Sequence, residues 1–438
     1  MGNRGSGITL RRFNKMFVLS KLYIQNKDKV ILDTTFSDKE NNHSTINFIT
    51  LIIGENGVGK SFLLKSLVDV FIFLEKINTY HRKPKYKYEK FTLEYYLDNN
   101  LYSIVRISGS EIHYYKNNLE IKYEDLVLPS RVLVVSFMVN DKFIFSKNDV
   151  TESYRYLGVR SSTNSTYTSS INRKITDNLI KAVNSNLVPQ IKDMLALLKF
   201  DPYLEIEVTE IREKKLYFKE SYIMDLGTLD TPVHIDDSEY NKNTIITIYF
   251  KKDNDKITFD LCSSGEKHIL FAFTGILSQI RDNSLILIDE PEISLHPEWQ
   301  MLYITTLYKL FGKYRNCLFV IASHSHYFVS DLKPETSSII AFYKDDRLSK
   351  SRLISYSTYA WSAENIIYNV FGIRTTRNYY FEADLNALII LMEEYSGNEK
   401  EKVEIQKLTD KLKHYLYDSK DPLFAVIEQA EELINAKS

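Results

Sequence analysis

Continuous apolar runs and period-two alternation organise the first third of the chain. Residues 16–22 (MFVLSKL) and 47–53 (NFITLII) predict strands, and the second run ends at Gly54. An apolar run that stops at a glycine is typical of a buried strand entering a loop. Residues 61–77 have the spacing of a long helix. Residues 91–136 predict short strands separated by Asn-Asn and Gly-Ser turns.

The remaining two thirds alternate between helical and strand-like patterns. Residues 171–198 have helical spacing, and residues 203–260 are rich in strand-forming side chains. Four further elements follow as helix, strand, helix and strand: 265–281, 284–289, 297–312 and 317–323. From residue 363 onward the pattern is helical, with interruptions near Gly372 and Gly397.

This order predicts an α/β fold in which helices flank a mixed sheet and a mainly helical region follows. An insert at about 137–240 separates the two α/β halves. The insert has no sustained heptad repeat, so the sequence predicts a short helical insert without a long coiled coil.

Composition limits the partners and the cellular location that can be expected for the protein. The formal net charge of the 438 residues is −1, so any contact with nucleic acid must depend on local patches. The two cysteines, Cys262 and Cys317, are far apart and form no metal-binding pair. The start of the chain lacks the apolar core of a signal peptide, and no apolar run reaches membrane-spanning length. A cytoplasmic protein without a membrane anchor is therefore expected.

The strongest chemical motif follows the strand at 47–53. The residues GENGVGKS match the phosphate-loop pattern GxxxxGK[ST], between a buried strand and a helix. Backbone N–H groups of such a loop surround phosphates, the lysine reaches the β- and γ-phosphates, and the hydroxyl binds Mg²⁺. ATP and Mg²⁺ are therefore the expected cofactors. The predicted nucleotide-binding residues are Gly54, Glu55, Asn56, Gly57, Val58, Gly59, Lys60, Ser61 and Phe62.

A second apolar strand ends in two adjacent acids. The segment SLILIDEPEISLHP covers residues 284–297 and places Asp289 and Glu290 at the strand end. Asp289, with Ser61, is predicted to hold Mg²⁺, and Glu290 to orient and polarise the attacking water. Taken alone, the same letters also fit a strand that ends in a solvated acidic turn. The phosphate loop upstream favours the catalytic interpretation.

The segment CSSGEK lies at a predicted helix start before that acidic strand. Ser263, Ser264, Gly265 and Glu266 offer hydroxyls and backbone N–H groups to an anion. In isolation, a plain N-cap with an acid in the first turn is the better interpretation. The position of the segment, ahead of the acidic strand, favours nucleotide binding.

Another strand ends at IASHSH. His324 is predicted to hydrogen-bond the γ-phosphate or the attacking water. A structural turn histidine is the alternative. His326 is expected to be structural, and His296 to position the loop after Glu290.

In their order along the chain, the phosphate loop, SSGEK, DEPE and the SHSH segment resemble the motifs of the head of ABC ATPases. The resemblance implies a head at residues 16–345, a C-terminal region at 346–438, and head-to-tail pairing of two copies. Gly54–Ser61, Asp289, Glu290 and His324 would line one nucleotide, and Ser263–Gly265 would come from the second copy. The resemblance therefore implies an ATPase that assembles with itself as a dimer or higher oligomer.

The sequences of two of these motifs indicate a particular branch of that family. SSGEK and DEPEISLHPEWQ resemble the RecF-, OLD- and Rad50-like branch rather than transporter subunits. DKFIFS (141–146), YRYLGVRSS (154–162) and NVFGIRTTRNYY (369–380) look like segments of the PtuA-like ATPases of Septu and retron-associated defence systems. That likeness implies a sensor or regulator subunit in anti-phage defence, which controls a separate effector such as a nuclease.

Several features leave alternatives open. No glutamine loop is identifiable, although Ser136 stands near its expected place, and no Toprim or HNH pattern indicates a nuclease within the chain. A DNA-repair ATPase of the RecF kind remains the main alternative, because lysines and tyrosines interleave in one loop and could contact nucleic acid. A solvated loop is the other explanation. The loop residues are Tyr80, Arg82, Lys83, Lys85, Tyr86, Lys87, Tyr88 and Lys90.

Two weaker features concern the ends of the chain. A basic cluster precedes the first strand, and an apolar face in the tail is expected either to pack on its own domain or to dock a partner. The residues are Arg4, Arg11, Arg12 and Lys15 in the cluster, and Leu385, Leu388, Ile389 and Met392 on the tail face.

Overall fold

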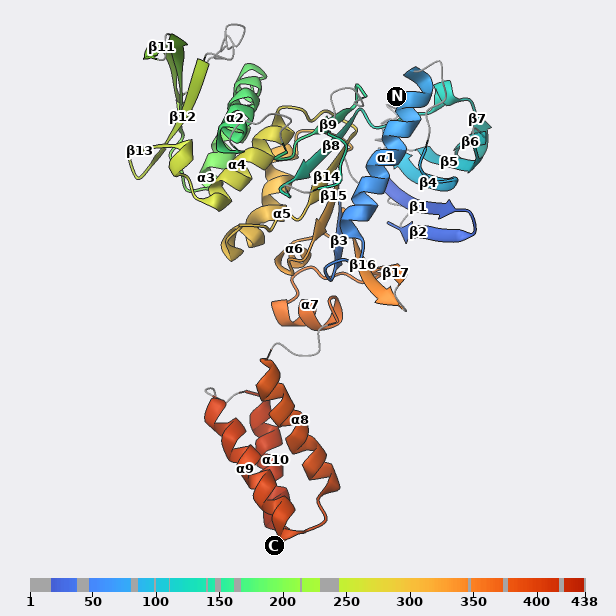
Figure 1. The fold of residues 1–438 in the computed structure, drawn as a ribbon, viewed down its shortest axis with the longest axis vertical. Helices are drawn as coiled ribbons and strands as arrows, with labels where there is room; N and C mark the ends of the chain where they lie inside the picture. Colours follow the sequence, from blue (N-terminus) through green and yellow to red (C-terminus); the bar gives the residue numbers. More distant parts are fainter. Residues whose placement is uncertain are drawn as a thin grey trace, which may run out of the picture. The chain divides into compact units, whose positions relative to one another are not determined.

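The chain divides into two compact units, residues 1–366 and residues 367–438. A computed structural model describes residues 17–37, 47–79, 86–97, 100–109, 111–138, 141–145, 151–160, 167–212, 215–228, 244–345, 348–372, 377–416 and 421–436. The first unit contains all the strands, and the second is a bundle of helices (Figure 1).

A seven-stranded sheet forms the centre of the first unit. Its order is β17-β16-β3-β15-β14-β8-β9, and every neighbouring pair is parallel except β17 with β16. The strands are β3 (Phe48–Gly54), β8 (Arg131–Ser136), β9 (Tyr154–Tyr156), β14 (Ser284–Asp289), β15 (Leu318–Ser323), β16 (Ser337–Asp345) and β17 (Leu348–Leu353). Strands β14 and β15 are buried along their whole length, as parallel strands covered on both faces require.

A six-stranded antiparallel sheet accompanies the central one. Its order is β2-β1-β4-β5-β6-β7. The strands are β1 (Val18–Asn26), β2 (Lys29–Thr35), β4 (Lys90–Leu97), β5 (Asn100–Ser108), β6 (Glu111–Lys116) and β7 (Leu119–Ile121). Along β4, buried and half-buried positions alternate, which is the pattern of a strand with one face in the core.

Helix α1 (Lys60–Thr79) joins the two sheets. Most of its apolar side chains between Leu63 and Leu74 are buried. They belong to one hydrophobic core together with the antiparallel sheet and with alternate residues of the central strands, such as Leu287 and Val320. Figure 1 shows α1 running between the two sheets. Because Lys60 is its first residue, this buried helix fixes the position of the phosphate loop.

Helices cover the side of the central sheet away from α1 (Figure 1). They are α4 (Ser264–Leu277), α5 (Pro297–Phe311) and α6 (Tyr327–Ser330). A further short helix, α7 (Ala363–Asn369), follows the last strand of the sheet along the chain. Nearly all of α4 is buried, from Gly265 to Leu277. The start of α4 is therefore the part of this helix that a second molecule could reach.

The insert between the two halves of the central sheet is helical only in its first part. Helices α2 (Tyr167–Asn184) and α3 (Val188–Leu197) precede a four-stranded antiparallel sheet of order β11-β10-β12-β13. The strands are β10 (Tyr203–Arg212), β11 (Lys215–Asp225), β12 (Thr244–Lys252) and β13 (Asp255–Thr258). This sheet accounts for the strand-rich pattern at 203–260.

Among its described residues, the second unit has three long helices that share a core of their own. Helices α8 (Tyr379–Glu394), α9 (Glu399–Tyr415) and α10 (Leu423–Ala436) pack through Leu388, Ile405, Leu412, Ile427 and Ile434. On the tail face singled out from the sequence, Leu388 is buried and Leu385 and Met392 pack against this core, whereas Ile389 is 37% exposed. Most of that face therefore packs within its own unit.

The structure confirms the predicted fold class: a mixed α/β head with flanking helices, a short insert and a helical C-terminal region. One segment differs in detail, since 348–353, grouped above with the helical region, forms β17 and pairs with β16 in the central sheet. Within the described ranges, none of the helices has both the length and the apolar character that crossing a bilayer requires.

Replacing Leu67 by alanine is expected to lower the free energy of unfolding of the first unit by about 2–5 kcal/mol, because it leaves a cavity between the two sheets. Leu67 is fully buried, whereas Leu119, the matched control, is 72% exposed. Both tryptophans, Trp299 and Trp361, lie in the first unit. Urea unfolding followed by tryptophan fluorescence therefore measures this unit, and equal effects of Leu67→Ala and Leu119→Ala would contradict the core position of α1.

Candidate functional site

The phosphate loop connects the end of β3 to the start of α1. At Gly54, φ is +149° and an added Cβ would lie 2.4 Å from the carbonyl oxygen of Phe342 on β16. At Gly59, φ is +109°, a conformation that other residues rarely adopt. Val58 is buried in the core shared with α1. Two glycines and an apolar anchor therefore give the loop its shape.

A cleft of about 400 Å³ opens beside this loop. Many of the residues predicted from the sequence line it: Asn56, Gly57, Gly59, Lys60, Ser61, Phe62, Asp289 and Glu290. Five residues that were not predicted also line it: Lys65, Met138, Asp141, Lys142 and Phe143. The cleft therefore lies at the carboxyl ends of parallel strands, where open α/β sheets bind ligands.

Lys60 is the buried cation of the cleft, with a side chain that is 3% exposed. Its ammonium group donates to the carbonyl oxygens of Gly54 (3.0 Å) and Glu55 (3.2 Å) and contacts the His324 ring. Glu290 Oε1 lies 3.7 Å away. Burial lowers the pKa of Lys60, and the charge of Glu290 opposes this shift. The structure therefore brings together three of the predicted residues, Lys60, Glu290 and His324.

Asp289 and Ser61 meet on the other side of the loop. The Ser61 hydroxyl donates to Asp289 Oδ1 at 2.9 Å, although the two residues are 228 positions apart. Asp289 is 2% exposed, and burial raises its pKa to about 7. A divalent cation would favour the charged form of this carboxylate. A hydroxyl and a carboxylate at this spacing suit Mg²⁺, which binds through few protein ligands and substrate phosphates.

Glu290 stands at a sharp bend after β14. Its φ is +53°, and its backbone N–H donates to the carbonyl oxygen of Ala322 at 2.9 Å. Its Oε1 lies 3.0 Å from Nε2 of His324. Burial favours protonation of Glu290, but the hydrogen bond and charge of His324, together with Lys60, hold its pKa below the usual value. The carboxylate is therefore available as a base.

Glu292 is a third carboxylate in this region that the sequence analysis did not single out. Its side chain accepts a hydrogen bond from the backbone N–H of His324, and its Oε2 is buried without a partner among the described residues. Burial raises the pKa of Glu292. Glu292 fixes the backbone that carries His324. Its sequence signal is its place two residues after Glu290.

Asp141 orders the segment that follows β8, close to where a glutamine loop was expected. Its side chain is 1% exposed, pairs with Arg160 at 3.0 Å and accepts a hydrogen bond from the Tyr156 hydroxyl. It also accepts from the backbone N–H of Phe143 at 3.1 Å. These contacts join DKFIFS to YRYLGVRSS, although residues 146, 161 and 162 of those segments lie outside the described part of the chain.

The SSGEK segment forms a helix cap. Ser263 caps α4 in a capping box with Glu266, and the second Glu266 oxygen binds Lys252 at 2.9 Å. An added Cβ at Gly265 would lie 2.8 Å from the Ser294 carbonyl oxygen. Ser263 and Ser264 are exposed, whereas Gly265 and Glu266 are buried. None of these residues lines the 400 Å³ cleft of the same chain.

His268 connects α4 to a loop of the cleft region. Its ring stacks against Phe137, which follows β8. Burial lowers the pKa of His268 to about 3, so the ring is neutral. The start of α4 therefore packs against the segment that follows β8.

Two other histidines take the structural places that the sequence analysis expected. The His296 ring accepts from the backbone N–H of Glu298 at 3.3 Å and caps α5. His326 precedes α6 and lies against Tyr327.

The tyrosines of the basic loop do not face solvent where they are described. Tyr86 packs against Phe73 and Phe91, and Tyr88 is 8% exposed, so neither ring is free to stack on a base. The idea that these two tyrosines stack on nucleic acid is therefore wrong. Tyr80, Arg82, Lys83, Lys85 and the cluster Arg4, Arg11, Arg12 and Lys15 lie outside the described residues.

Comparison with known proteins identifies related sequences. A family model described as "AAA domain, putative AbiEii toxin, Type IV TA system" matches residues 49–330. A Septu protein PtuA from Bacillus mycoides (strain KBAB4) is 22% identical over 384 residues, which cover 83% of this chain and 46% of that protein. A Septu protein PtuA from Bacillus thuringiensis is 25% identical over 158 residues, 32% of this chain and 39% of that protein.

A third relative is protein ea59 of Escherichia phage lambda, 32% identical over 93 residues, 21% of this chain and 16% of that protein. The chain thus spans less than half the length of these three relatives. Among solved structures, the SMC head domain from Thermotoga maritima matches with a TM-score of 0.39 and 14% identity, covering 77% of this chain and 100% of that one. The predicted resemblance to the Septu protein PtuA is confirmed at this level of identity.

Lowering the pH from 7.5 to 5.5 is expected to destabilise the first unit through His268. The unfolded histidine takes up a proton near pH 6.5, whereas the folded one, with a pKa of about 3, does not. The contribution of His268 to the free energy of unfolding is therefore fully present above pH 6.5 and decreases as the pH falls. Between pH 7.5 and pH 5.5 the loss is about 1.4 kcal/mol. His268→Gln removes the titration.

The measurement is urea unfolding by tryptophan fluorescence at both pH values, with His414→Gln in the second unit as control. Asp289, whose pKa is raised, changes stability in the opposite direction, so only the difference between wild type and His268→Gln is diagnostic. Identical pH dependence of these two proteins would contradict a buried neutral His268.

Proposed function

Because the chain belongs to the AAA-domain family of AbiEii type, we propose that it binds ATP and Mg²⁺, hydrolyses ATP, and acts as a sensor or regulator subunit in prokaryotic anti-phage defence. The observation that supports this proposal most directly is the meeting of Lys60, Glu290 and His324 beside the Ser61–Asp289 pair. Lys60 and Ser61 open α1, Asp289 ends β14, and Glu290 and His324 follow β14 and β15. All of them except His324 line the 400 Å³ cleft, and His324 contacts both Lys60 and Glu290.

The residues fit a nucleotide phosphate and its metal ion. The loop from Gly54 to Ser61 would surround the phosphates with backbone N–H groups, and Lys60 would bind their oxygens. Phosphate oxygens would replace His324 and Glu290 as partners of the Lys60 ammonium. Ser61 and Asp289 would hold Mg²⁺, which when bound stabilises negative charge on the phosphates. Nucleotide binding thus releases Glu290 and His324 from Lys60.

Glu290 and His324 are the proposed catalytic pair. Glu290, with its lowered pKa, is charged at neutral pH and would orient and polarise the attacking water. His324 Nε2 lies 3.0 Å from Glu290, and its backbone is held by Glu292. Because Glu292 acts through His324, it is a positioning residue in this scheme.

A second copy of the chain would complete the site. Ser263 and Ser264 are exposed at the start of α4, yet they do not line the cleft of their own chain. Their hydroxyls and the first N–H groups of α4 would contact the nucleotide bound by the partner, as in head-to-tail pairing. Both oxygens of Glu266 have partners within the chain, so its proposed contribution is to hold the cap.

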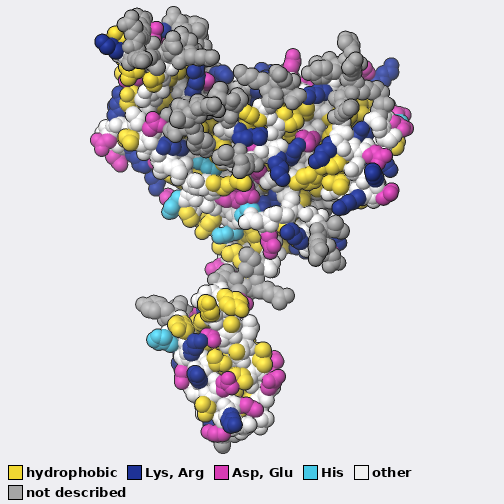
Figure 2. Space-filling view, viewed as in Figure 1, with side chains coloured by type: hydrophobic (Ala, Val, Ile, Leu, Met, Phe, Trp, Pro, Cys, Tyr) yellow, Lys and Arg dark blue, Asp and Glu magenta, His cyan; other side chains and the backbone are white. Residues whose placement is uncertain are grey.

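The defence role rests on the Septu PtuA relatives and would require a separate effector, such as a nuclease, of Septu-like or retron-associated type. The helical second unit offers apolar side chains for such a partner, and Figure 2 shows apolar groups on its surface. The exposed ones include Tyr379, Tyr380, Ile390, Val403 and Tyr415. ATP binding would hold copies together, and hydrolysis would change the hold on the effector.

A RecF-like DNA-repair ATPase is the alternative. On the face shown in Figure 2, Lys and Arg side chains of the first unit are interspersed with Asp and Glu. Together with the buried Tyr86 and Tyr88, this favours the defence proposal. ATP-dependent binding of duplex DNA by the pure protein would favour the repair alternative instead.

Lys60→Ala is expected to abolish ATP binding, because the β- and γ-phosphates lose their buried cation. Isothermal titration calorimetry with ATP and Mg²⁺ measures the effect. Lys76→Ala, in the last turn of the same helix, removes an equal charge outside the cleft and should leave the affinity unchanged. Undiminished ATP affinity in folded Lys60→Ala would refute the phosphate-loop assignment.

Glu290→Gln is expected to slow ATP hydrolysis by about 10²-fold or more and to accumulate ATP-bound dimers. Mass photometry with and without ATP and Mg²⁺, beside a phosphate-release assay, tests both parts. Glu298→Gln, at an exposed carboxylate on α5, is the matched control. Normal hydrolysis in Glu290→Gln would remove Glu290 from the catalytic role, and an absence of ATP-dependent assembly would argue against the composite site.

A further inference from the structure

A second cleft lies at the opposite end of the central strands from the phosphate loop. Its volume is about 530 Å³. Arg131 opens β8 and is paired in register with Ser284, whereas Ser136 at the other end is paired with Asp289. Five residue steps of about 3.3 Å each therefore separate the new cleft from the metal-binding end of the same strands.

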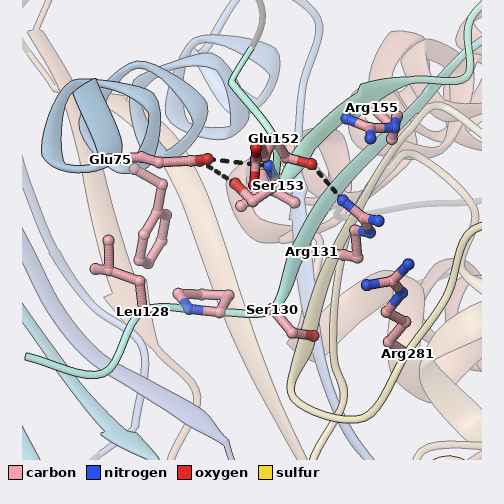
Figure 3. Close-up of a pocket in the computed structure, with 11 residues that line it drawn as sticks. Glu75, Leu128, Ser130, Arg131, Glu152, Ser153, Arg155 and Arg281 are labelled. Carbon is pink, nitrogen blue, oxygen red and sulfur yellow. Dashed lines mark hydrogen bonds between the residues drawn. The ribbon is translucent and has the colours of Figure 1, made fainter. Parts of the chain in front are cut away.

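Three arginines converge on one side of this cleft. Arg131 comes from β8, Arg155 from β9 and Arg281 from the segment between α4 and β14 (Figure 3). Lys313 adds a further positive charge in an adjoining cleft of about 270 Å³, which Arg131 and Arg281 also line. Cations from segments far apart in sequence are thus gathered at one place.

None of the three arginines forms an ion pair with a carboxylate in the part of the chain that the structure describes. Arg131 donates to the backbone carbonyl of Glu152, and Arg155 to those of Tyr154 (2.7 Å) and Thr151 (3.4 Å). The Nε of Arg131 is buried and has no hydrogen-bond partner among those residues. A buried donor without a partner costs stability and indicates a missing acceptor.

The acids that border the cleft form no ion pair with the arginines among the described residues. Glu75 lies across the cleft from them, and its carboxylate accepts from the backbone N–H of Ser153 (3.0 Å) and from the Ser153 hydroxyl (Figure 3). Glu152 is exposed. Burial and the neighbouring charges of Arg155 and Arg281 lower the pKa of Arg131, and the charges of Glu75 and Glu152 oppose this shift without cancelling it. The mutual repulsion of the three cations would be relieved by an anion between them.

The other wall of the cleft is apolar. Phe71, Leu128, Pro129 and Val132 line it. Guanidinium groups bind phosphate oxygens in a planar, two-point arrangement, and a pocket of this size with an apolar wall suits a small organic molecule. The lining therefore matches a ligand with phosphate at one end and a flat or apolar group at the other.

We propose that this arginine cleft is a second ligand site, which binds a free nucleotide by its phosphates through Arg131, Arg155 and Arg281 and by its base against Leu128. The site is separate from the phosphate loop and does not depend on ATP hydrolysis. Its ligand would bind at the start of β8 and β14, whose other ends carry Ser136 and Asp289.

The test uses the full chain with Lys60→Ala, so that the phosphate loop does not compete. Calorimetric titration with inorganic pyrophosphate and with ATP should each give one bound ligand per chain. The Arg281 side chain has no described hydrogen bond within the protein that a substitution would remove. Arg281→Gln should lower the affinities for pyrophosphate and for ATP by about tenfold or more each. Arg315→Gln, an exposed arginine nearby that lines neither cleft, should change them by less than about twofold.

Leu128→Ala distinguishes contacts to the base from contacts to the phosphates. It should lower the affinity for ATP and leave the affinity for pyrophosphate unchanged. If Lys60→Ala does not fold, the wild-type chain serves instead, with pyrophosphate stoichiometry expected to fall from two to one on Arg281→Gln. Absence of pyrophosphate binding, or binding insensitive to Arg281→Gln, overturns the proposal. The last probe is a single-stranded DNA of about 20 nucleotides, which is long enough to fill at least one single-strand binding site. If this DNA binds in an arginine-dependent way while ATP and pyrophosphate do not bind, the proposal is overturned and the cleft is a nucleic-acid site.

Discussion

The burial of the Lys60 ammonium group is the constraint on which the candidate site depends. A charged group in a nearly dry position is stable only where oxygen acceptors and opposite charges surround it. Here the acceptors are carbonyl groups of the phosphate loop, and the opposite charge is Glu290. The charged partner is placed by the end of a buried strand, since Glu290 directly follows β14.

That constraint also explains how ATP could change the state of the protein. In the structure described, Lys60, Glu290 and His324 satisfy one another. A phosphate that takes over Lys60 would release a base whose pKa lies below its usual value, next to a histidine held in place by Glu292. Nucleotide binding and assembly of the catalytic pair would then be a single event. His268 packs α4 against Phe137, which follows β8, and a second copy would dock at the exposed start of α4.

The central sheet has different chemistry at its two ends. The carboxyl ends of β3, β14 and β15 carry the acids and the phosphate loop. The amino end of β8 lies beside arginines that form no ion pair with a carboxylate among the described residues. Strands β8 and β14, which pair in register from Arg131–Ser284 to Ser136–Asp289, run from one cleft to the other.

The sequence by itself determined the motifs whose chemistry is local. Glycines at 54 and 59 and the lysine and serine that follow are set by the loop, and Asp289 and Glu290 are placed by the end of a buried strand. The α/β order was predictable for the same reason, because continuous apolar runs and helical spacing are local patterns. The burial and the contacts of the tryptophan, tyrosine and arginine side chains could not be predicted from such local patterns.

Only the tertiary structure decided which distant residues meet. Asp141 with Arg160, Glu292 with the backbone of His324, and the convergence of Arg131, Arg155 and Arg281 arise from chain crossings that no local pattern encodes. The tertiary structure also placed Tyr86 and Tyr88 in the core, where the sequence had suggested a nucleic-acid loop. Burial is a property of the packed molecule, so the pKa values of Asp289, Glu290 and His268 follow from packing and not from residue type alone.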